Sequence, residues 1–239
     1  MPALAKGSRK SYDEGCIAAH ALDLIGDRWA LLVARELMLG PRRFSAIRAG
    51  LPGISANVLT QRLDEMEQAG LVDRTTLPED ARATVYGLTR AGQGLWPVLK
   101  ALCLWGVGQP GHDPSKHISP TALMLSMRAL CARDRAGRHL VTVRLGAEGF
   151  TIRTAPGAYE VRRERAERAP LRFAGTPCQM ARAVYGPAPL ADLVAAGMIG
   201  FEGNPEEGQR FVDLFALRPP PAVSDRAVDP GGQMDEAFG

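Results

Sequence analysis

A run of side chains suited to reading base edges lies between residues 55 and 62. An asparagine or glutamine amide can pair bidentately with adenine, and an arginine can reach guanine or a phosphate. Val58, Leu59 and Leu63 fall on the other side of the same helical repeat. Because a polar helix face is most often only solvated, the surrounding elements must decide its role. The polar members of the run are Ser55, Asn57, Thr60, Gln61 and Arg62.

Four further arginines could bind phosphates, the contacts that position a protein on duplex DNA. Arg42 and Arg43 stand just before a short helical pattern. Arg74 stands in the first of two strand-like runs, and Arg82 stands in the polar loop that joins them. We expect all four to flank the helix that carries Asn57 and Gln61.

The order of elements in residues 13–106 predicts a winged helix-turn-helix. In this arrangement one helix enters the major groove and its N-terminal residues reach the bases. Ser55 is placed to cap that helix, Gly70 to end it, and Thr89 to cap the last helix. The predicted elements are helices at 13–25, 28–37, 45–49 and 56–68, strands at 71–75 and 84–88, and a helix at 90–105.

The second half predicts a separate domain over residues 120–217, which makes the whole chain α+β. Period-two alternation indicates a meander of strands, and Thr176-Pro177 opens a helix in the preferred order. Residues 1–12 are expected to be a flexible arm, 107–119 a linker and 218–239 a disordered tail. The predicted elements are helices at 120–133, from 177, at 190–196 and from 205 to 215, and strands at 140–145, 149–153, 158–163, 171–173 and 198–201.

Composition limits the remaining classes of function. The chain has 239 residues, a net charge of +3 and four separated cysteines, so we expect two domains and reduced thiols. It shows no apolar leader, no membrane span and no metal-ligand spacing. No nucleophile, phosphate-loop or paired-carboxylate motif is evident either. We therefore expect a cytoplasmic protein that is not an enzyme and has no cofactor, metal or membrane partner.

The N-terminal domain resembles the HxlR-type winged-helix regulators. The resemblance runs from about Cys16 to Trp105 and depends on four segments: Leu24-Ile-Gly-Asp-Arg-Trp29, Gly40-Pro-Arg-Arg-Phe44, Gly53-Ile-Ser-x-x-Val-Leu-Thr-Gln-Arg-Leu63 and Tyr86-Gly-Leu-Thr89. It implies a homodimer that joins through its first and last helices and reads a pseudo-palindromic DNA operator. We expect Leu95, Leu99 and Leu102 to pack across that two-fold interface.

Residues 120–217 resemble the sterol-carrier-protein fold, which implies a sheet-and-helix sandwich around an apolar tunnel. Such a tunnel suits a small hydrophobic effector. Each apolar side chain there is also a candidate for ordinary core. The candidate lining residues are Met124, Met127, Phe150, Ile152, Met180, Val184, Leu193 and Phe201.

The leading hypothesis is therefore a dimeric DNA-binding transcription regulator under the control of a hydrophobic effector. Two alternatives stay open. Several HxlR-type proteins keep a redox-sensing thiol where Cys16 stands, although a thiol on an apolar helix face is commonly inert core. The chain could also be a lipid or small-molecule carrier that its N-terminal module merely dimerises.

Overall fold

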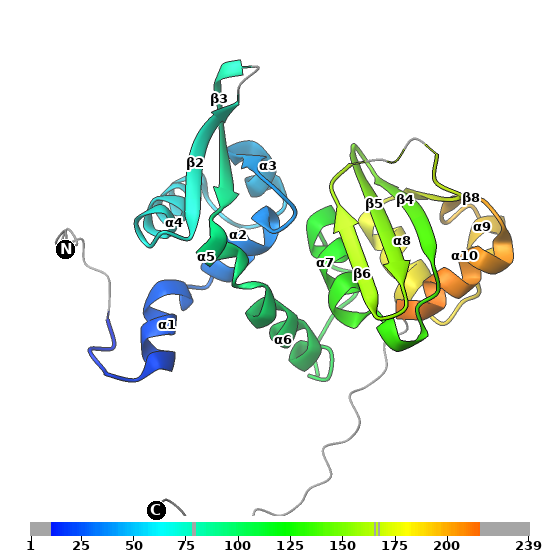
Figure 1. Ribbon diagram of the computed structural model, residues 1–239, viewed down its shortest axis with the longest axis horizontal. Helices are drawn as coiled ribbons and strands as arrows, with labels where there is room; N and C mark the ends of the chain where they lie inside the picture. Colours follow the sequence, from blue (N-terminus) through cyan, green and yellow to red (C-terminus); the bar gives the residue numbers. More distant parts are fainter. Residues whose placement is uncertain (1–10, 78–79, 165, 167, 216–239) are drawn as a thin grey trace, which may run out of the picture.

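A computed structural model describes residues 11–77, 80–164, 166 and 168–215. Side chains of residues 77 and 80–83 are not described. The chain forms two domains (Figure 1), one before and one after residues 107–119, which contain no helix or strand. The tail predicted at 218–239, and most of the arm predicted at 1–12, lie outside the described residues.

The N-terminal domain is a winged helix-turn-helix. Its small sheet has the strand order β1-β3-β2, with both pairs antiparallel, and the β2–β3 hairpin is the predicted wing. The elements are α1 (Ile17–Ile25), α2 (Ala30–Leu37), β1 (Arg42–Arg43), α3 (Phe44–Ala49), α4 (Ala56–Gln68), β2 (Val72–Leu77), β3 (Asp80–Leu88), α5 (Arg90–Gln93) and α6 (Trp96–Gly106).

Local sequence signals set most of these boundaries. The Ser55 side chain accepts a hydrogen bond from the Val58 backbone N–H, so it caps α4 as expected. Gly70 follows α4 with a φ of 68°, a conformation that suits glycine. The Thr89 side chain caps α5, the short helix that follows the β2–β3 hairpin. The single helix predicted there is two helices, because α5 ends with Gly94 as its C-cap and α6 restarts at Trp96 with a proline in its first turn.

The C-terminal domain is a five-stranded sheet with helices packed on one face (Figure 1). Its elements are α7 (Pro120–Leu130), η1 (Arg133–Arg135), β4 (His139–Leu145), β5 (Glu148–Ala155), β6 (Ala158–Arg162), β7 (Leu171–Gly175), α8 (Pro177–Tyr185), α9 (Leu190–Ala195), β8 (Gly200–Glu202), α10 (Pro205–Val212) and η2 (Asp213–Phe215).

The sheet is not the continuous meander that alternation suggested. Its order is β6-β5-β4-β7-β8, and β7 pairs parallel with β4. The segment between β6 and β7 therefore crosses the sheet. Thr151 holds it, because its hydroxyl donates to the Glu164 carbonyl and accepts from the Ala166 N–H, both at 2.8 Å. The neighbours Phe150 and Ile152 point to the helical side, so the crossing segment covers the opposite face.

The two domains meet in an apolar contact. Leu99 of α6 and Leu125 of α7 are buried against Met38, which follows α2. This contact places the end of α2 beside the C-terminal domain. Among the residues described, no helix is both long and apolar enough to cross a membrane.

Candidate nucleic-acid interface

Helix α4 presents a polar face to solvent and an apolar face to the core. Asn57, Thr60 and Gln61 are exposed in its first half. Leu59 and Leu63 on the reverse side are fully or almost fully buried. Gln61 Nε2 donates to Glu65 Oε1 at 2.9 Å, which orients that amide along the helix. Since the core fixes the helix from behind, its N-terminal polar side chains form an exposed surface on a helix that is held in place.

Arg62 is not part of this surface, which corrects the sequence-based prediction. The residue is 9% exposed, and its Nη2 lies 2.6 Å from Asp27 Oδ2. Its Nη1 pairs with Glu65. Residues three and four apart share one helix face, and Arg62 follows the buried Leu59 by three. Arg62 therefore holds α4 to the segment before α2, and its side chain does not point outward toward a DNA groove.

Arg42 is also structural, and its predicted role as a phosphate clamp is wrong. It is 8% exposed. Its Nη1 donates to Glu36 Oε2 at 2.8 Å and to Thr121 Oγ1 at 3.0 Å. Its Nη2 pairs with Glu148 Oε1 at 2.7 Å. A guanidinium bound in this way has no group left at the surface for a phosphate.

The remaining predicted cations differ in their placement. Arg43 and Arg74 are exposed, and the Arg74 guanidinium lies 5.5 Å from the centroid of the Tyr86 ring. The side chain of Arg82 lies outside the described residues. Arg48 on α3 is exposed as well. Arg48 was not selected from the sequence, although Phe44 and Ile47 mark the inward face of α3 and Arg48 falls on the outward face.

A buried acidic side chain, Glu36, was also not predicted from the sequence, and its partners lie where the two domains meet. Glu36 is completely buried and its carboxylate accepts from three residues. Arg35 lies at 2.9 Å, Arg42 at 2.8 Å, and the Ser119 hydroxyl donates at 2.7 Å. A Cβ at position 50 would overlap this carboxylate, so Gly50 leaves room for it. Its burial had one signal in the sequence: Glu36 falls on the same helix face as the apolar residues Val33 and Leu37.

The three predicted dimer residues lie in different environments. Leu99 is 7% exposed and packs within the chain against Met38 and Leu125. Leu95 is half-buried beside the same contact. Leu102 is 46% exposed. Of the three, only Leu102 presents a largely open apolar side chain.

Cys16 is exposed at the N-cap of α1. Hydrogen bonding from the backbone N–H groups of Ala19 and Ala18 lowers the pKa of its thiol. A lowered pKa raises the fraction of reactive thiolate at neutral pH. This placement differs from an inert thiol in a core.

The eight side chains predicted to line an apolar tunnel form part of the domain core. Seven are buried, and Phe201 packs half-buried against them. Two cavities, of about 470 and 330 Å³, occur among the described residues, and neither lies inside this cluster of eight side chains. Of the eight residues only Val184 lines either one. In the part of the chain that is described, no group of three or more metal-ligating side chains is placed to hold an ion.

Comparison with known proteins covers the first domain. The family model described as HxlR-like helix-turn-helix matches residues 24–113. YvaP of Bacillus subtilis (strain 168), an uncharacterized HTH-type transcriptional regulator, is 40% identical over 85 residues, which are 36% of this chain and 79% of YvaP. The chain belongs to the HxlR-like helix-turn-helix family.

A second relative is known in both sequence and structure. YodB of Bacillus subtilis (strain 168), an HTH-type transcriptional regulator, is 40% identical over 85 residues, or 36% of this chain and 76% of YodB. The solved reduced form of YodB is 36% identical, spans 41% of this chain and 100% of that one, and has a TM-score of 0.37. The family and its relatives are transcriptional regulators and not enzymes. The HxlR-like match ends at residue 113.

Proposed function

We propose that this protein is a dimeric, sequence-specific DNA-binding transcription regulator whose recognition helix is α4. The observation that carries the proposal is the exposed row Asn57, Thr60 and Gln61 in the first half of a helix fixed by a buried face. These side chains have the chemistry to read base edges. Arg43, Arg48 and Arg74 are exposed nearby in sequence and supply positive charge for the phosphates.

The salt dependence of binding to duplex DNA tests this function against that of a carrier. Neutralising several phosphates releases counterions, so the affinity of the full chain should fall steeply between 50 and 200 mM salt, by roughly 10³-fold if about six phosphates are contacted. Fluorescence anisotropy with a labelled duplex measures the slope. A chain that binds no duplex at low salt is not a DNA-binding regulator, and the carrier alternative would then gain support.

The proposed dimer joins the exposed apolar faces of α1 and α6 of two copies. Ile17 is 86% exposed and Trp105 is 65% exposed. Monomeric proteins seldom expose large apolar side chains in groups. A second copy is the proposed cover, because α1 and α6 flank the same DNA-binding domain. The other exposed members are Leu22 of α1 and Val98, Leu102 and Leu104 of α6.

Trp105→Glu is expected to convert the dimer to a monomer, since it places a charge in an apolar contact. Sedimentation at about 10 µM should show dimers for the parent chain and monomers for the variant, because a useful regulator dimer must form by that concentration. Met198→Glu is the matched control, since Met198 is also exposed but lies on the other domain. A monomeric parent chain would contradict the proposed interface.

We also propose that the C-terminal domain has a sterol-carrier-like architecture and gives the regulator its response to a small molecule. The support is a mixed five-stranded sheet with α7, α8 and α10 packed on one face. The core residues of this domain pack on one another, so the response needs a site other than its interior.

A second candidate is thiol control through Cys16, favoured by its exposure and lowered pKa. With oxidised glutathione, the Cys16 thiolate would attack one sulfur, form a mixed disulfide and release one glutathione thiolate. Duplex affinity should then change about tenfold in the parent chain, a typical coupling, and stay constant in Cys16→Ser. Cys178→Ser, which removes another exposed thiol, should behave like the parent. An equal response in Cys16→Ser would dismiss this candidate.

A further inference from the structure

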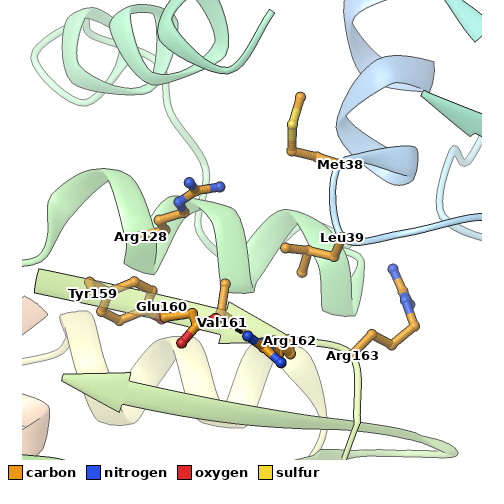
Figure 2. Close-up of a pocket in the computed structure, with 8 residues that line it drawn as sticks. All are labelled: Met38, Leu39, Arg128, Tyr159, Glu160, Val161, Arg162 and Arg163. Carbon is orange, nitrogen blue, oxygen red and sulfur yellow. Dashed lines mark hydrogen bonds and ion pairs between the residues drawn. The ribbon is translucent and has the colours of Figure 1, made fainter. Parts of the chain in front are cut away.

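A cavity of about 470 Å³ lies where the two domains meet. Met38 and Leu39 line it from the end of α2, Arg128 lines it from α7, and residues 159–163 line it from β6 and the residue after it. Figure 2 shows the side chains of Arg128 and Leu39 above the strand that carries Tyr159 and Val161. Both domains therefore contribute walls, and the volume is in the range of small-ligand sites.

Arg128 is a cation in this cavity that no described carboxylate pairs with. It is half-buried, and its guanidinium carbon lies 4.2 Å from the centroid of the Trp96 ring. In the ranges that the structure describes, no carboxylate pairs with it. Burial, and then the charge of Arg133, lower the pKa of Arg128. An anion beside it would relieve both effects.

Two other lining residues each carry one donor atom that has no partner among the described residues. The Tyr159 hydroxyl is buried, in a residue 7% exposed, and makes no hydrogen bond in the described chain. The Nε of Arg163 is likewise buried, and no described residue accepts from it, although the two Nη atoms of Arg163 bind Glu148 and Thr121. Arg162, in contrast, is exposed and pairs with Glu160 at 2.7 Å. The Tyr159 hydroxyl and the Arg163 Nε have almost no accessible surface, so neither reaches a ligand in the cavity, and recognition of an anion falls to Arg128.

The same cavity has an apolar side, formed by Met38, Leu39 and Val161. We propose that it binds a small organic carboxylate with an apolar body, with the carboxylate on Arg128 and the body against Leu39 and Val161. The ligand differs from the small hydrophobic effector expected from the sequence in that it carries an anionic group, which an arginine recognises.

The position of the cavity couples a bound ligand to α4, the proposed DNA-binding helix. Met38 directly follows α2, and α2 packs against α4. A ligand held between the domains favours the relative placement of the domains in which both contact it. Ligand binding therefore alters operator affinity if that placement binds DNA more or less tightly than the other placements do. This consequence rests on the proposed function, whereas binding itself does not.

The test is isothermal titration of the full chain with benzoate, 1-naphthoate and octanoate. Benzamide, 1-naphthamide and octanamide are the neutral controls of the same shape. At least one carboxylate should bind with a Kd below about 1 mM, and its amide should bind about tenfold or more weakly. Inorganic phosphate is titrated as well, and phosphate binding tighter than every carboxylate would overturn the apolar part of the proposal.

Variants locate the site. Arg128→Gln should weaken carboxylate binding by about tenfold or more, and Arg172→Gln by less than about threefold, since Arg172 is exposed, pairs with Glu202 and does not line the cavity. Leu39→Trp keeps Arg128 but fills the cavity, so it should also abolish binding. Binding by either Arg128→Gln or Leu39→Trp at the parent affinity would overturn the proposal, as would no binding by any carboxylate.

Operator binding by the ligand-free chain is measured in parallel. If the chain binds duplex DNA but no carboxylate, the cavity proposal fails and the proposed function stands. If the chain binds a carboxylate but no DNA, the proposed function fails and the cavity proposal stands.

Discussion

Glu36→Ala is expected to lower the free energy of unfolding by about 3–5 kcal/mol, the usual cost of breaking a buried ion pair from one side. Glu36 is completely buried and binds Arg35, Arg42 and Ser119. Its loss leaves the nearly buried Arg42 with one carboxylate, Glu148, in place of two. Urea unfolding followed by circular dichroism measures the change.

The matched control is Glu160→Ala. Glu160 also pairs with an arginine, but both side chains of the Glu160–Arg162 pair are largely exposed. Surface pairs of this kind contribute about 0–1 kcal/mol. If Glu36→Ala costs no more than Glu160→Ala, the buried cluster does not stabilise the domain junction. Because Glu36 binds Ser119, which caps the first helix of the C-terminal domain, Glu36→Ala should also separate the unfolding of the two domains.

Most elements of the fold could be predicted because their signals are local. Ser55, Thr89 and Thr176 each cap the helix that the sequence assigned to them. Apolar spacing then located the buried faces of α2 and α4. The parallel pairing of β7 with β4 has no such signal, because alternation identifies a strand but not its neighbour.

The candidate site was predicted less completely, for the same reason. Asn57, Thr60 and Gln61 are exposed as their helical positions indicate. Arg42 and Arg62 look like surface cations in the sequence. Arg42 is buried by partners from the C-terminal domain, and Arg62 is buried against Asp27 before α2. The Ser119 hydroxyl that binds Glu36 is 83 residues away along the chain. Contacts of this range depend on how the domains dock, which no residue spacing encodes.

The double variant Asn57→Ala/Gln61→Ala has the second large expected effect. Each good base contact contributes about 1–3 kcal/mol of discrimination, so removing two should weaken specific binding by about 2–6 kcal/mol if they act independently. Non-specific binding, which depends on phosphates, should change little. Thr76→Ala on the exposed part of β2 is a control in the same domain. Anisotropy titrations with specific and scrambled duplexes separate the two effects.

The most direct test of the central claim is a selection of duplexes from a random pool by the full chain. The parent should enrich an inverted repeat with half-site centres about 34–36 Å apart, or one helical turn, because each copy of a two-fold dimer inserts one α4. The Asn57→Ala/Gln61→Ala chain should lose the enrichment at one or two positions of each half-site. No enriched sequence with the parent, or an identical sequence bound equally tightly by the double variant, would contradict the assignment of α4 as the recognition helix.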